Sequence, residues 1–356
     1  MKILVTKFKS IGDVLLVTPL LKNLSILYPD SKIDLVLKEG TSDLIDELTF
    51  INKIFFIKSH TKILSKFFDN LKLLLKLRSR DYSIFIGTDR GERTAIFSLF
   101  SGANIRIGRK NELGFLYKKS FTNYFSFHGE RHTLDLNLDP IRILNKKVVS
   151  RKILINNPLK YHSKISKYLP ISQEFIHIHP VSQCAYKSVS NELMAKIIDF
   201  CEIDLNYKTV LTASKSNEDI DRINDITNLC ESKPINLCGM LSLNEVSALN
   251  SLSKLLIVLD TAIMHISTAN NIPVIAFFGP TSANNWGPLD GEISTYSYKR
   301  KGGVQHNGIH TIISSNDPCV PCSQSGCQNS GISNCLNNLN FDLIKRQILR
   351  SLRNDS

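Results

Sequence analysis

The sequence lacks the two glycine signatures that most often mark a nucleotide site. Its 17 glycines form neither a G-x-G-x-x-G nor a G-x-x-x-x-G-K-[ST] motif, so we expect neither a dinucleotide-binding loop nor a P-loop. The chain also contains no run of about 18 apolar residues, the length that a membrane-spanning helix requires. A strand-like segment follows Met1 directly, without the charged and then apolar regions of a secretory leader. We therefore expect a cytoplasmic protein.

The composition indicates a globular protein with more than one domain. The chain has 356 residues, of which 42% are hydrophobic, and it has only 12 prolines. This length exceeds what one hydrophobic core usually supports, so two domains are expected. The apolar fraction is large enough to form sizeable cores, which argues against disorder.

Basic residues are concentrated in the N-terminal half of the chain. Residues 1–168 contain 30 Lys and Arg against 15 Asp and Glu, whereas residues 169–356 contain 14 against 17. The whole excess behind the net charge of +12 therefore lies in the first half. The positive electrostatic field of such an excess attracts nucleic acid, an anionic membrane or a phosphorylated substrate. Because the sequence carries no nucleic-acid-binding motif, we expect no nucleic-acid partner.

Strand-like and helix-like segments alternate along both halves. In the first half, strands are predicted for KILVTKF, KIDLVLK, NKIFFIK and YSIFIG, with helices over residues 13–28, 42–48, 61–80 and 93–100. In the second half, strands are predicted for EFIHIHP, YKTVLTAS, PINLCG, KLLIVLD and IPVIAFFGP, with helical patterns between them. This alternation is typical of parallel, doubly wound sheets.

We therefore predict an α/β protein with two Rossmann-like domains that face a central cleft. The domains are expected at residues 1–165 and 172–338, with the basic, weakly patterned stretch 145–173 as their connection. The segment FDLIKRQILRSL predicts a C-terminal helix within residues 339–356. Ligands of such folds bind at the carboxyl ends of the strands, so the informative residues should follow strands directly.

One such position is the turn in FKSIGDVLLVTP, after the first predicted strand. Gly12 leaves room for a ligand to approach the backbone closely. Asp13 opens the predicted helix, where the field of the helix keeps a carboxylate ionised. Asp13 could therefore take a proton from a bound hydroxyl group. The alternative is that Asp13 only caps the helix.

Two further positions follow strands in the second half. The strand in LLIVLDTAIMH ends at Asp260, and the helix opened by residues 261–265 has free N–H groups that can bind an anion. In IHPVSQCAYK, the strand breaks at Pro180, and Lys187 follows backbone amides that could clamp a diphosphate. The alternatives are an Asp260 that only caps the helix, a His265 that only packs and a Lys187 that is only solvated.

Three segments together resemble a known family. In this order, KSIGDVLLVTPLLKNLSILYPDSKIDLV, IHPVSQCAYKS and VLDTAIMHISTANNIPVIAFFGPTSANNWGP are similar to the hallmark blocks of glycosyltransferase family 9, the ADP-heptose:lipopolysaccharide heptosyltransferases. The resemblance extends over nearly the whole chain. It implies a GT-B fold with an N-terminal acceptor domain and a C-terminal nucleotide-sugar donor domain. It also implies inverting, metal-independent transfer of heptose from ADP-heptose, with no cofactor required.

The resemblance further implies roles for individual residues. Asp13 would be the general base, with Gly12 leaving room for the sugar. Lys187 would bind the donor diphosphate, and Asp260 with His265 would bind the sugar and phosphate region of the donor. Lys187 and the helix amides would stabilise the departing diphosphate, which removes the need for a metal.

Other matches concern the adenosine and phosphate groups of the donor. Glu218 would contact the adenosine side, while Ser182, Thr261 and Ala262 would supply hydroxyl or backbone contacts to phosphate. The sequence departs from the family at Val181 and Ala262, where many members have glycine. Larger side chains at these positions would tighten the phosphate pocket.

The segment TKILSKFFDNLKLLLKLRSR predicts a basic amphipathic helix. Its cations gather on one side, and most of its apolar residues lie opposite. The cations are Lys62, Lys66, Lys72, Lys76 and Arg80, and the apolar residues are Leu64, Phe67, Phe68, Leu71, Leu74 and Leu75. Such a helix can cover a sheet or lie on an anionic membrane. We expect the apolar side to cover a sheet and the charges to attract the inner membrane, where a phosphorylated glycolipid acceptor would be found.

The eight cysteines fall into two groups. Cys184, Cys201, Cys230 and Cys238 are scattered and are expected to be packed or incidental. Cys319, Cys322, Cys327 and Cys335 form a C-x2-C-x4-C-x7-C cluster, which in a reducing cytosol suits a structural zinc ion better than disulfides. Similar cysteine-rich tails occur in some family members without establishing a metal, so the sequence leaves zinc open.

Two alternatives to heptose transfer remain open from the sequence. One is a family 9 glycosyltransferase that uses another nucleotide sugar for a different surface glycan, since it would share all these motifs. The other is a non-catalytic sugar-binding protein built from two α/β domains. The absence of a leader segment argues against a periplasmic version of the latter.

Overall fold

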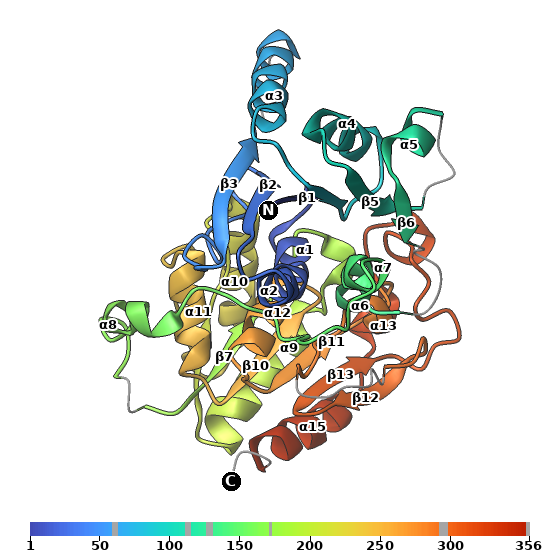
Figure 1. The fold of residues 1–356 in the computed structure, drawn as a ribbon. Coiled ribbons are helices and arrows are strands. Elements are labelled where there is room, and N and C mark those ends of the chain that lie inside the picture. Colours follow the sequence, from blue (N-terminus) through green and yellow to red (C-terminus); the bar gives the residue numbers. More distant parts are fainter. Residues whose placement is uncertain (59–62, 111–114, 126–130, 171–172, 292–297, 354–356) are drawn as a thin grey trace. The chain divides into compact units, whose positions relative to one another are not determined.

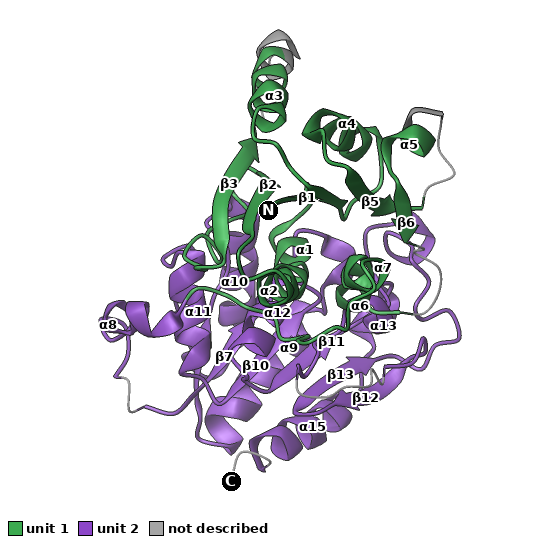
Figure 2. Cartoon of the chain, viewed as in Figure 1, with its two compact units in different colours: residues 1–156 green, residues 157–356 purple. Residues whose placement is uncertain are grey.

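The computed structural model describes residues 1–58, 63–110, 115–125, 131–170, 173–291 and 298–353. The chain divides into two compact units, residues 1–156 and residues 157–356 (Figure 2). Each unit contains one sheet of mainly parallel strands with helices on both faces (Figure 1). The predicted α/β class with doubly wound parallel sheets is therefore confirmed.

The first unit has a six-stranded sheet in the order β3-β2-β1-β4-β5-β6. Every strand pair in it is parallel. The strands are β1 (Lys2–Lys7), β2 (Lys32–Lys38), β3 (Ile51–Ile57), β4 (Ile84–Gly87), β5 (Ile105–Arg109) and β6 (Asn123–Phe125). The chain moves outward from β1 through β2 to β3 and then returns to add β4 on the other side of β1. The strand order therefore reverses between β1 and β4, and the carboxyl ends of these two strands form a crevice for a ligand.

Helices cover both faces of this sheet. One face packs against α3, α4 and α5 through a cluster that includes Leu4, Phe85, Leu77, Phe97 and Phe121. The helices of the unit are α1 (Ile11–Leu15), α2 (Thr18–Leu27), α3 (Ile63–Arg78), α4 (Glu92–Ser101), α5 (Phe115–Ser120), α6 (Thr133–Asn137) and α7 (Asp139–Ile143).

The helix predicted over residues 13–28 begins earlier and is broken into α1 and α2. The break precedes Pro19, which has no N–H to donate to the carbonyl of Leu15. The hydroxyl of Thr18 donates to that carbonyl at 2.8 Å instead. The chain thus starts a second helix after a short interruption.

The helix predicted over residues 42–48 is wrong, because this segment forms turns. The side chain of Asn156 takes the place of a helical hydrogen bond between Asp43 and Glu47. Its amide group donates to the carbonyl of Asp43 at 2.8 Å and accepts from the N–H of Glu47 at 3.0 Å. Local sequence cannot reveal this contact, because the partner lies more than a hundred residues away.

The amphipathic helix is α3, and only part of its predicted arrangement can be compared. Lys62 lies outside the described residues, as do the side chains of residues 63–67. Leu74 is buried, as expected for a helix that covers a sheet. Phe68 and Leu75, however, are 65% and 58% exposed. Leu77, which is not among the predicted apolar residues, is fully buried and makes part of the contact with the sheet. The buried face of α3 is therefore rotated about the helix axis relative to the predicted apolar face.

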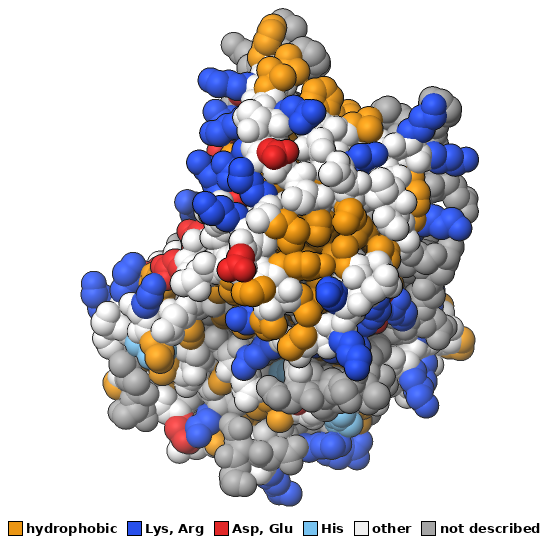
Figure 3. Space-filling model, viewed as in Figure 1, with side chains coloured by type: hydrophobic (Ala, Val, Ile, Leu, Met, Phe, Trp, Pro, Cys, Tyr) orange, Lys and Arg blue, Asp and Glu red, His pale blue; other side chains and the backbone are white. Residues whose placement is uncertain are grey.

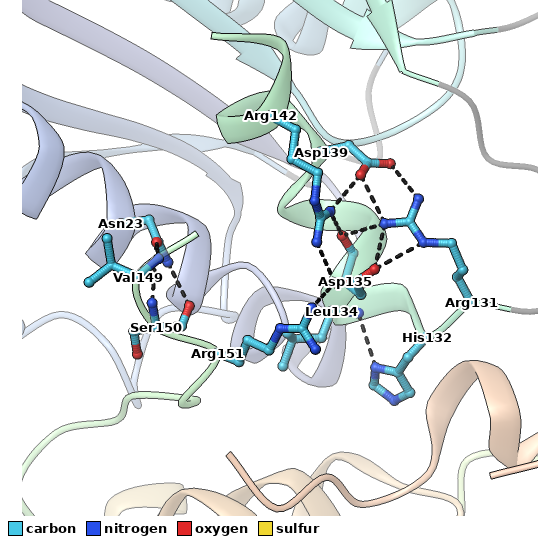
Figure 4. A network of polar contacts seen from close by, with 10 residues as sticks. All are labelled: Asn23, Arg131, His132, Leu134, Asp135, Asp139, Arg142, Val149, Ser150 and Arg151. Carbon is cyan, nitrogen blue, oxygen red and sulfur yellow. Dashed lines mark hydrogen bonds and ion pairs between the residues drawn. The ribbon is translucent and has the colours of Figure 1, made fainter. Parts of the chain in front are cut away.

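Side chains fasten the last segment of the first unit to its body (Figure 4). The side chain of Asn23 on α2 accepts from the N–H of Val149 and donates to the carbonyl of Ser150, both at 2.6 Å. Arg151 donates to Asp135 on α6 at 2.9 Å. Residues 145–173 were expected to connect the two domains. These hydrogen bonds hold the first part of that stretch, residues 145–156, within the first unit.

The same view shows a charged network around Asp135 and Asp139 (Figure 4). Arg131 and Arg142 each bind both carboxylates. Burial would raise the pKa of the Asp135 carboxyl, but the hydrogen bonds from these arginines outweigh it and hold the pKa below its usual value. The network therefore joins α6 and α7.

The second unit has a seven-stranded sheet in the order β12-β13-β11-β10-β7-β8-β9. All pairs are parallel except β12 with β13, which are antiparallel. The strands are β7 (Phe175–His179), β8 (Lys208–Leu211), β9 (Ile235–Asn236), β10 (Leu255–Leu259), β11 (Val274–Phe277), β12 (Gly303–Asn307) and β13 (His310–Ser314). The order reverses between β7 and β10, which places a second ligand crevice at their carboxyl ends.

One face of this sheet packs against α9, α10 and α15, and the other packs against α8, α11 and α12. The predicted C-terminal helix is α15, whose Ile344 and Ile348 are fully buried in the core of this unit. The helices are α8 (His162–Ile165), α9 (Asn191–Asp199), α10 (Asn217–Leu229), α11 (Leu243–Ser251), α12 (Ala262–Ala269), α13 (Ala283–Trp286), α14 (Asn334–Asn337) and α15 (Phe341–Arg353). Short 3-10 helices are η1 (Pro158–Tyr161), η2 (Ala185–Lys187) and η4 (Cys327–Asn329), and η3 (Phe200–Asp204) is a π-helix that directly follows α9. Across the described ranges, no helix is long and apolar enough to span a membrane.

Candidate functional site

The crevice of the second unit brings together two of the predicted site residues. Lys187 ends the turn η2 in the loop after β7, and Asp260 directly follows β10. Because β7 and β10 are neighbours in the sheet, their carboxyl ends lie side by side. The ammonium Nζ of Lys187 lies 2.7 Å from Oδ2 of Asp260. The pair therefore lies where the strand order reverses.

This ion pair is largely shielded from water. The side chain of Lys187 is 21% exposed and that of Asp260 is 10% exposed. Burial alone would lower the pKa of Lys187, but the charge and hydrogen bond of Asp260 outweigh it, so the pKa is raised. Lys187 is thus held as a cation at the edge of the sheet, and it is not the freely solvated lysine of the alternative interpretation.

The helix that follows Asp260 presents free polar groups at the same edge. Its N-cap is Thr261 and not Asp260, so the capping alternative for Asp260 is wrong. The Thr261 side chain makes no capping bond, and its Oγ1 is buried without a hydrogen-bond partner among the described residues. The first N–H groups of α12, at Ala262 and Ile263, have no partner within the helix. His265 is buried in the first turn, at 4% exposure.

Two side chains hold the loop that carries Lys187. Arg222 on α10 donates to the carbonyl of Pro180 at 3.1 Å and to that of Val189 at 2.7 Å. The hydroxyl of Ser333 donates to the carbonyl of Tyr186 at 2.6 Å. The loop is therefore anchored at its two ends and next to Lys187, which fixes the position of the cation.

The crevice of the first unit contains a buried charge cluster around Lys7, the last residue of β1. Its ammonium lies 3.0 Å from Oδ1 of Asp89, after β4, and 3.4 Å from Oδ1 of Asp13 in α1. Lys7 is 1% exposed. Asp89 also accepts the N–H of Phe8, and the hydroxyl of Ser10 donates to Oδ2 of Asp13 at 2.8 Å. The residue at the N-cap is Ser10, so Asp13 does not cap the helix.

Arg109 adds a second buried cation near this cluster. It is the last residue of β5 and is 5% exposed. Burial and the neighbouring Arg90 lower its pKa to about 10, although Asp89 and Asp13 act in the opposite direction. The carboxyl edge of the first sheet therefore holds acids and cations together, as expected for a site that binds a polar or anionic ligand.

Comparison with known proteins assigns the chain to a family. The model of glycosyltransferase family 9 (heptosyltransferase) matches residues 70–307, which is more than half of the chain. The chain belongs to glycosyltransferase family 9. The resemblance seen in the sequence is thereby confirmed.

Individual family 9 relatives agree with this assignment. Lipopolysaccharide heptosyltransferase 3 of Escherichia coli K12 is 29% identical over 285 residues, which cover 78% of this chain and 82% of that protein. The structure of E. coli ADP-heptose LPS heptosyltransferase II has a TM-score of 0.76 at 17% identity and covers 100% of this chain and 99% of its own. E. coli heptosyltransferase WaaC with ADP-2-deoxy-2-fluoro heptose has a TM-score of 0.69 at 14% identity, with coverages of 98% and 99%. These structural likenesses show that the family 9 fold here is GT-B.

The remaining residues matched to family 9 lie near the same edge of the second sheet. Ser182 lies in the anchored loop, where its hydroxyl accepts the N–H of Cys184 at 3.4 Å. Glu218 is exposed in the first turn of α10. Its neighbour Asp219, which sequence reasoning missed, accepts the N–H of Ser214 at 3.0 Å. The acid fixed against the loop after β8 is therefore Asp219.

The backbone conformation does not require glycine at Gly12, Val181 or Ala262. Gly12 is buried inside α1, and neither it nor Val181 nor Ala262 has a positive φ. Val181 is 2% exposed and packs in the core of the second unit. The two departures from glycine therefore cause no backbone strain.

Besides Asp219, sequence reasoning missed four charged residues that organise the two crevices. They are Lys7, Asp89, Arg109 and Arg222. Asp89 and Arg109 could have been found from their positions at strand ends, the criterion that selected Asp260. Lys7 ends β1 and could have been found by the same criterion. Arg222 lies in a polar helix and carries no local signal.

The cysteine-rich segment does not form the zinc site that the spacing left open. Within the described part of the chain, no group of three or more Cys, His, Asp or Glu is arranged to hold a metal ion. All eight cysteines are free thiols, and Cys201 is buried. Burial raises the pKa of Cys335 to about 11, and the nearby thiols of its cluster add to this effect. Because Ser333 belongs to this segment, the segment helps to anchor the Lys187 loop.

Proposed function

We propose that this family 9 protein transfers heptose from ADP-heptose to an inner-core lipopolysaccharide acceptor. The observation that carries the proposal is the Lys187–Asp260 pair at the reversal point of the second sheet, beside the free N–H groups of α12. Backbone amides and a fixed cation are the groups that bind a diphosphate. The names of the relatives, which include a heptosyltransferase solved with ADP-2-deoxy-2-fluoro heptose, support this choice of donor.

In this proposal the second unit holds the donor and the first unit holds the acceptor. Lys187 and the amides of α12 bind the diphosphate and stabilise the charge that develops as ADP departs. The buried hydroxyl of Thr261, which has no partner among the described residues, is available to a phosphate oxygen. Asp260 keeps Lys187 in place and can accept a hydrogen bond from a sugar hydroxyl.

Asp13 is the proposed general base. It takes the proton of the acceptor hydroxyl while that oxygen attacks the anomeric carbon from the face opposite ADP, which inverts the configuration. Lys7 lies 3.0 Å from Asp89 and 3.4 Å from Asp13, so the two carboxylates share its positive charge.

Transfer is proposed to require no metal ion, because Lys187 and the helix amides supply the positive charge at the diphosphate. We expect turnover to be largely unchanged by EDTA. A strict requirement for added Mg²⁺ would contradict this part of the proposal.

Membrane attachment through α3 is a further part of the proposal. Phe68 and Leu75 are exposed on this helix, as are Lys72 and Lys76. Figure 3 shows hydrophobic and basic side chains side by side in the region of α3. Apolar side chains flanked by lysines suit an anionic membrane surface. Binding to phosphatidylglycerol vesicles should weaken in the Lys72→Gln/Lys76→Gln variant and with added salt, whereas Lys233→Gln in the second unit should have little effect. Equal binding of both variants would contradict this attachment.

The proposed function is tested by offering the purified protein a panel of nucleotide sugars with isolated core acceptors. Product masses identify the sugar that is transferred. We expect the mass increase of one heptose, with ADP-heptose as the donor. Transfer of a different sugar would favour another family 9 reaction, and binding without transfer from any donor would favour a sugar-binding protein.

A further inference from the structure

Lys7 lies between two carboxylates at the carboxyl edge of the first sheet. It is the last residue of β1 and is 1% exposed. Its ammonium Nζ is 3.0 Å from Oδ1 of Asp89 and 3.4 Å from Oδ1 of Asp13. Neither of these oxygens has a hydrogen-bond partner among the described residues. The ion pairs with Lys7 are therefore the contacts that compensate both oxygens.

Asp89 is fixed in position by the end of β1. Its strand, β4, is the neighbour of β1 in the sheet. The N–H and the hydroxyl of Thr88 both donate to the carbonyl of Thr6, at 3.3 Å and 2.8 Å. The other oxygen of Asp89, Oδ2, accepts the N–H of Phe8. Asp89 is thus fastened to the backbone on both sides of Lys7, which makes it a fixed anchor for the ammonium.

The contacts of Asp13 are different. Asp13 lies in the first turn of α1, and its Oδ2 accepts the hydroxyl proton of Ser10 at 2.8 Å. Ser10 is exposed, and no backbone N–H donates to either oxygen of Asp13 in the part of the chain that the structure describes. Of the two carboxylates that face Lys7, Asp89 is therefore bound to the backbone and Asp13 is not.

The cation between the two carboxylates allows both to be ionised. Like charges that lie close together in a buried site oppose each other's ionisation, whereas an opposite charge favours it. Arg109, at the end of β5, is a further buried cation whose charge acts on both Asp13 and Asp89. Lys7 and Arg109 therefore support the ionised carboxylate that a general base requires.

Lys7 acting on Asp13 alone would make this carboxylate a weak base. A nearby cation that favours the ionised form of an acid also opposes the uptake of a proton. A general base works best when its affinity for protons matches the working pH. Because Lys7 is shared with Asp89, its effect on Asp13 is reduced.

We propose that Asp89 is a positioning residue for the general base. It holds the ammonium of Lys7 between itself and Asp13, so that Asp13 is ionised and can still take the proton of the acceptor hydroxyl. The inference rests on the proposed function, because it takes Asp13 to be the base. It extends the site from the residue that accepts the proton to the pair that sets its strength.

The sharing of Lys7 is tested by urea unfolding, which requires no ligand and no activity. In Asp13→Asn and in Asp89→Asn, one carboxylate remains beside Lys7, so both variants should fold with modest decreases in the urea midpoint. In the double variant Lys7 is buried without either carboxylate. The midpoint of the double variant should therefore fall by more than the two single decreases together. A double variant that does not fold, beside folded single variants, gives the same answer.

Asp30→Asn is the control for this measurement. Asp30 is exposed in the turn before β2, so its effect should add to that of Asp13→Asn. Additive decreases in Asp13→Asn/Asp89→Asn would overturn the sharing of Lys7. Failure of either single variant to fold would also overturn it, because one carboxylate would then be insufficient for Lys7.

The role of Asp89 in the reaction is tested by the pH dependence of the transfer rate at saturating donor and acceptor. In Asp89→Asn the amide oxygen can still accept the N–H of Phe8, but Lys7 faces Asp13 alone. We expect the acidic limb of the profile to move to lower pH by about one unit and the plateau rate to fall. Lys7→Gln should move the limb to higher pH. Asp89→Glu, which retains the charge, should keep the limb of the wild type.

Two results would overturn the positioning role of Asp89. One is a lower rate in Asp89→Asn with an unmoved acidic limb, since damage to the fold alone lowers the rate at every pH. The other is a limb that moves in the same direction in Asp89→Asn and Lys7→Gln. If Asp13→Asn transfers heptose at the wild-type rate, the general base of the proposed function fails together with this role. The unfolding measurements still decide whether the two carboxylates share Lys7.

Discussion

At the scale of single residues, the pairing of Lys187 with Asp260 changes the expected effect of each substitution. The two charges lie 2.7 Å apart and are largely shielded from water. Removal of Lys187 therefore leaves an uncompensated carboxylate beside the proposed diphosphate position. Removal of Lys187 therefore weakens diphosphate binding in two ways. The attraction of the cation is lost, and the carboxylate of Asp260 repels the diphosphate.

We expect Lys187→Ala to weaken ADP binding by about tenfold to a hundredfold, the range for hydrogen bonds to charged groups. Transfer should slow further, because the contact strengthens as the diphosphate departs. The double variant Lys187→Ala/Asp260→Asn should bind ADP more tightly than Lys187→Ala alone, since the repulsion is removed. Titration of each variant with ADP measures these differences.

Lys345→Ala serves as the control for this comparison. Lys345 also forms an ion pair, with Asp342 on α15, but that pair lies on an exposed helix surface. Its removal should leave ADP affinity unchanged. Wild-type affinity in both Lys187→Ala and the double variant would show that the donor site is wrongly placed.

At the scale of elements, the anchored loop after β7 links the cysteine-rich segment to the proposed donor site. Ser333 holds the carbonyl of Tyr186, one residue before Lys187. Gly279 follows β11, and a side chain at this position would lie 2.7 Å from Leu336 and 3.2 Å from Cys335. The segment therefore packs against one loop and is hydrogen-bonded to another at the carboxyl edge of the second sheet.

We expect Ser333→Ala to increase hydrogen exchange in the loop of residues 181–189, because a hydrogen bond of about 1 kcal/mol is lost. Exchange in β7 should stay unchanged, since its amides belong to the sheet. Mass spectrometry of deuterated peptides measures both. Ser330→Ala is a matched control, because the hydroxyl of Ser330 bonds only within its own segment. An unchanged loop in Ser333→Ala would contradict its anchoring role.

The strands were the most predictable elements. Buried parallel strands form nearly continuous apolar runs, and the predicted segment KIDLVLK coincides with β2. The antiparallel hairpin of β12 and β13 was missed because its first strand, GVQHN, is mostly polar. The helix expected over residues 42–48 failed because Asn156, distant in sequence, replaces a helical hydrogen bond.

The candidate site was predictable where a residue directly follows a strand. This criterion found Asp260, and the segments that follow β1 and β7 contain Asp13 and Lys187. The structure brings Lys187 and Asp260 together. It could not reveal that His179 and Thr212 share a hydrogen bond, because that contact depends on the lateral order of β7 and β8 in the sheet. Pairings between strands are a property of the folded sheet and leave no trace in local spacing.

At the scale of the whole molecule, buried neutral histidines make stability depend on pH. Burial lowers the pKa of His177 to about 3 and those of His179 and His310 to about 4. In the unfolded chain their pKa is about 6.5. Above pH 6.5 these histidines are unprotonated in both the folded and the unfolded protein. Between that pH and the folded pKa values, only the unfolded protein binds protons at these histidines. The contribution of these histidines to the free energy of unfolding is therefore complete above pH 6.5 and is lost as the pH falls below it.

Between pH 7.5 and pH 5.5 we expect the free energy of unfolding to fall by about 1.4 kcal/mol for each of these histidines. Carboxylates contribute little in this range, because most titrate below it. Urea unfolding at the two pH values measures the difference, and His310→Asn should reduce the difference by the share of one histidine. Equal stability at both pH values would show that the imidazoles are protonated in the folded protein.

The central claim is that the two units divide the reaction, with the base on the first and the donor on the second. It is tested most directly by the transfer rate of Asp13→Asn at a donor concentration that saturates the wild type, with ADP affinity determined on the same sample. Asn keeps the shape of the side chain but cannot take the proton of the acceptor hydroxyl. We expect the rate to fall by about a hundredfold to ten-thousandfold, the contribution typical of general base catalysis, while ADP affinity stays within about twofold because Lys187 and α12 are untouched. A transfer rate close to that of the wild type would contradict the claim.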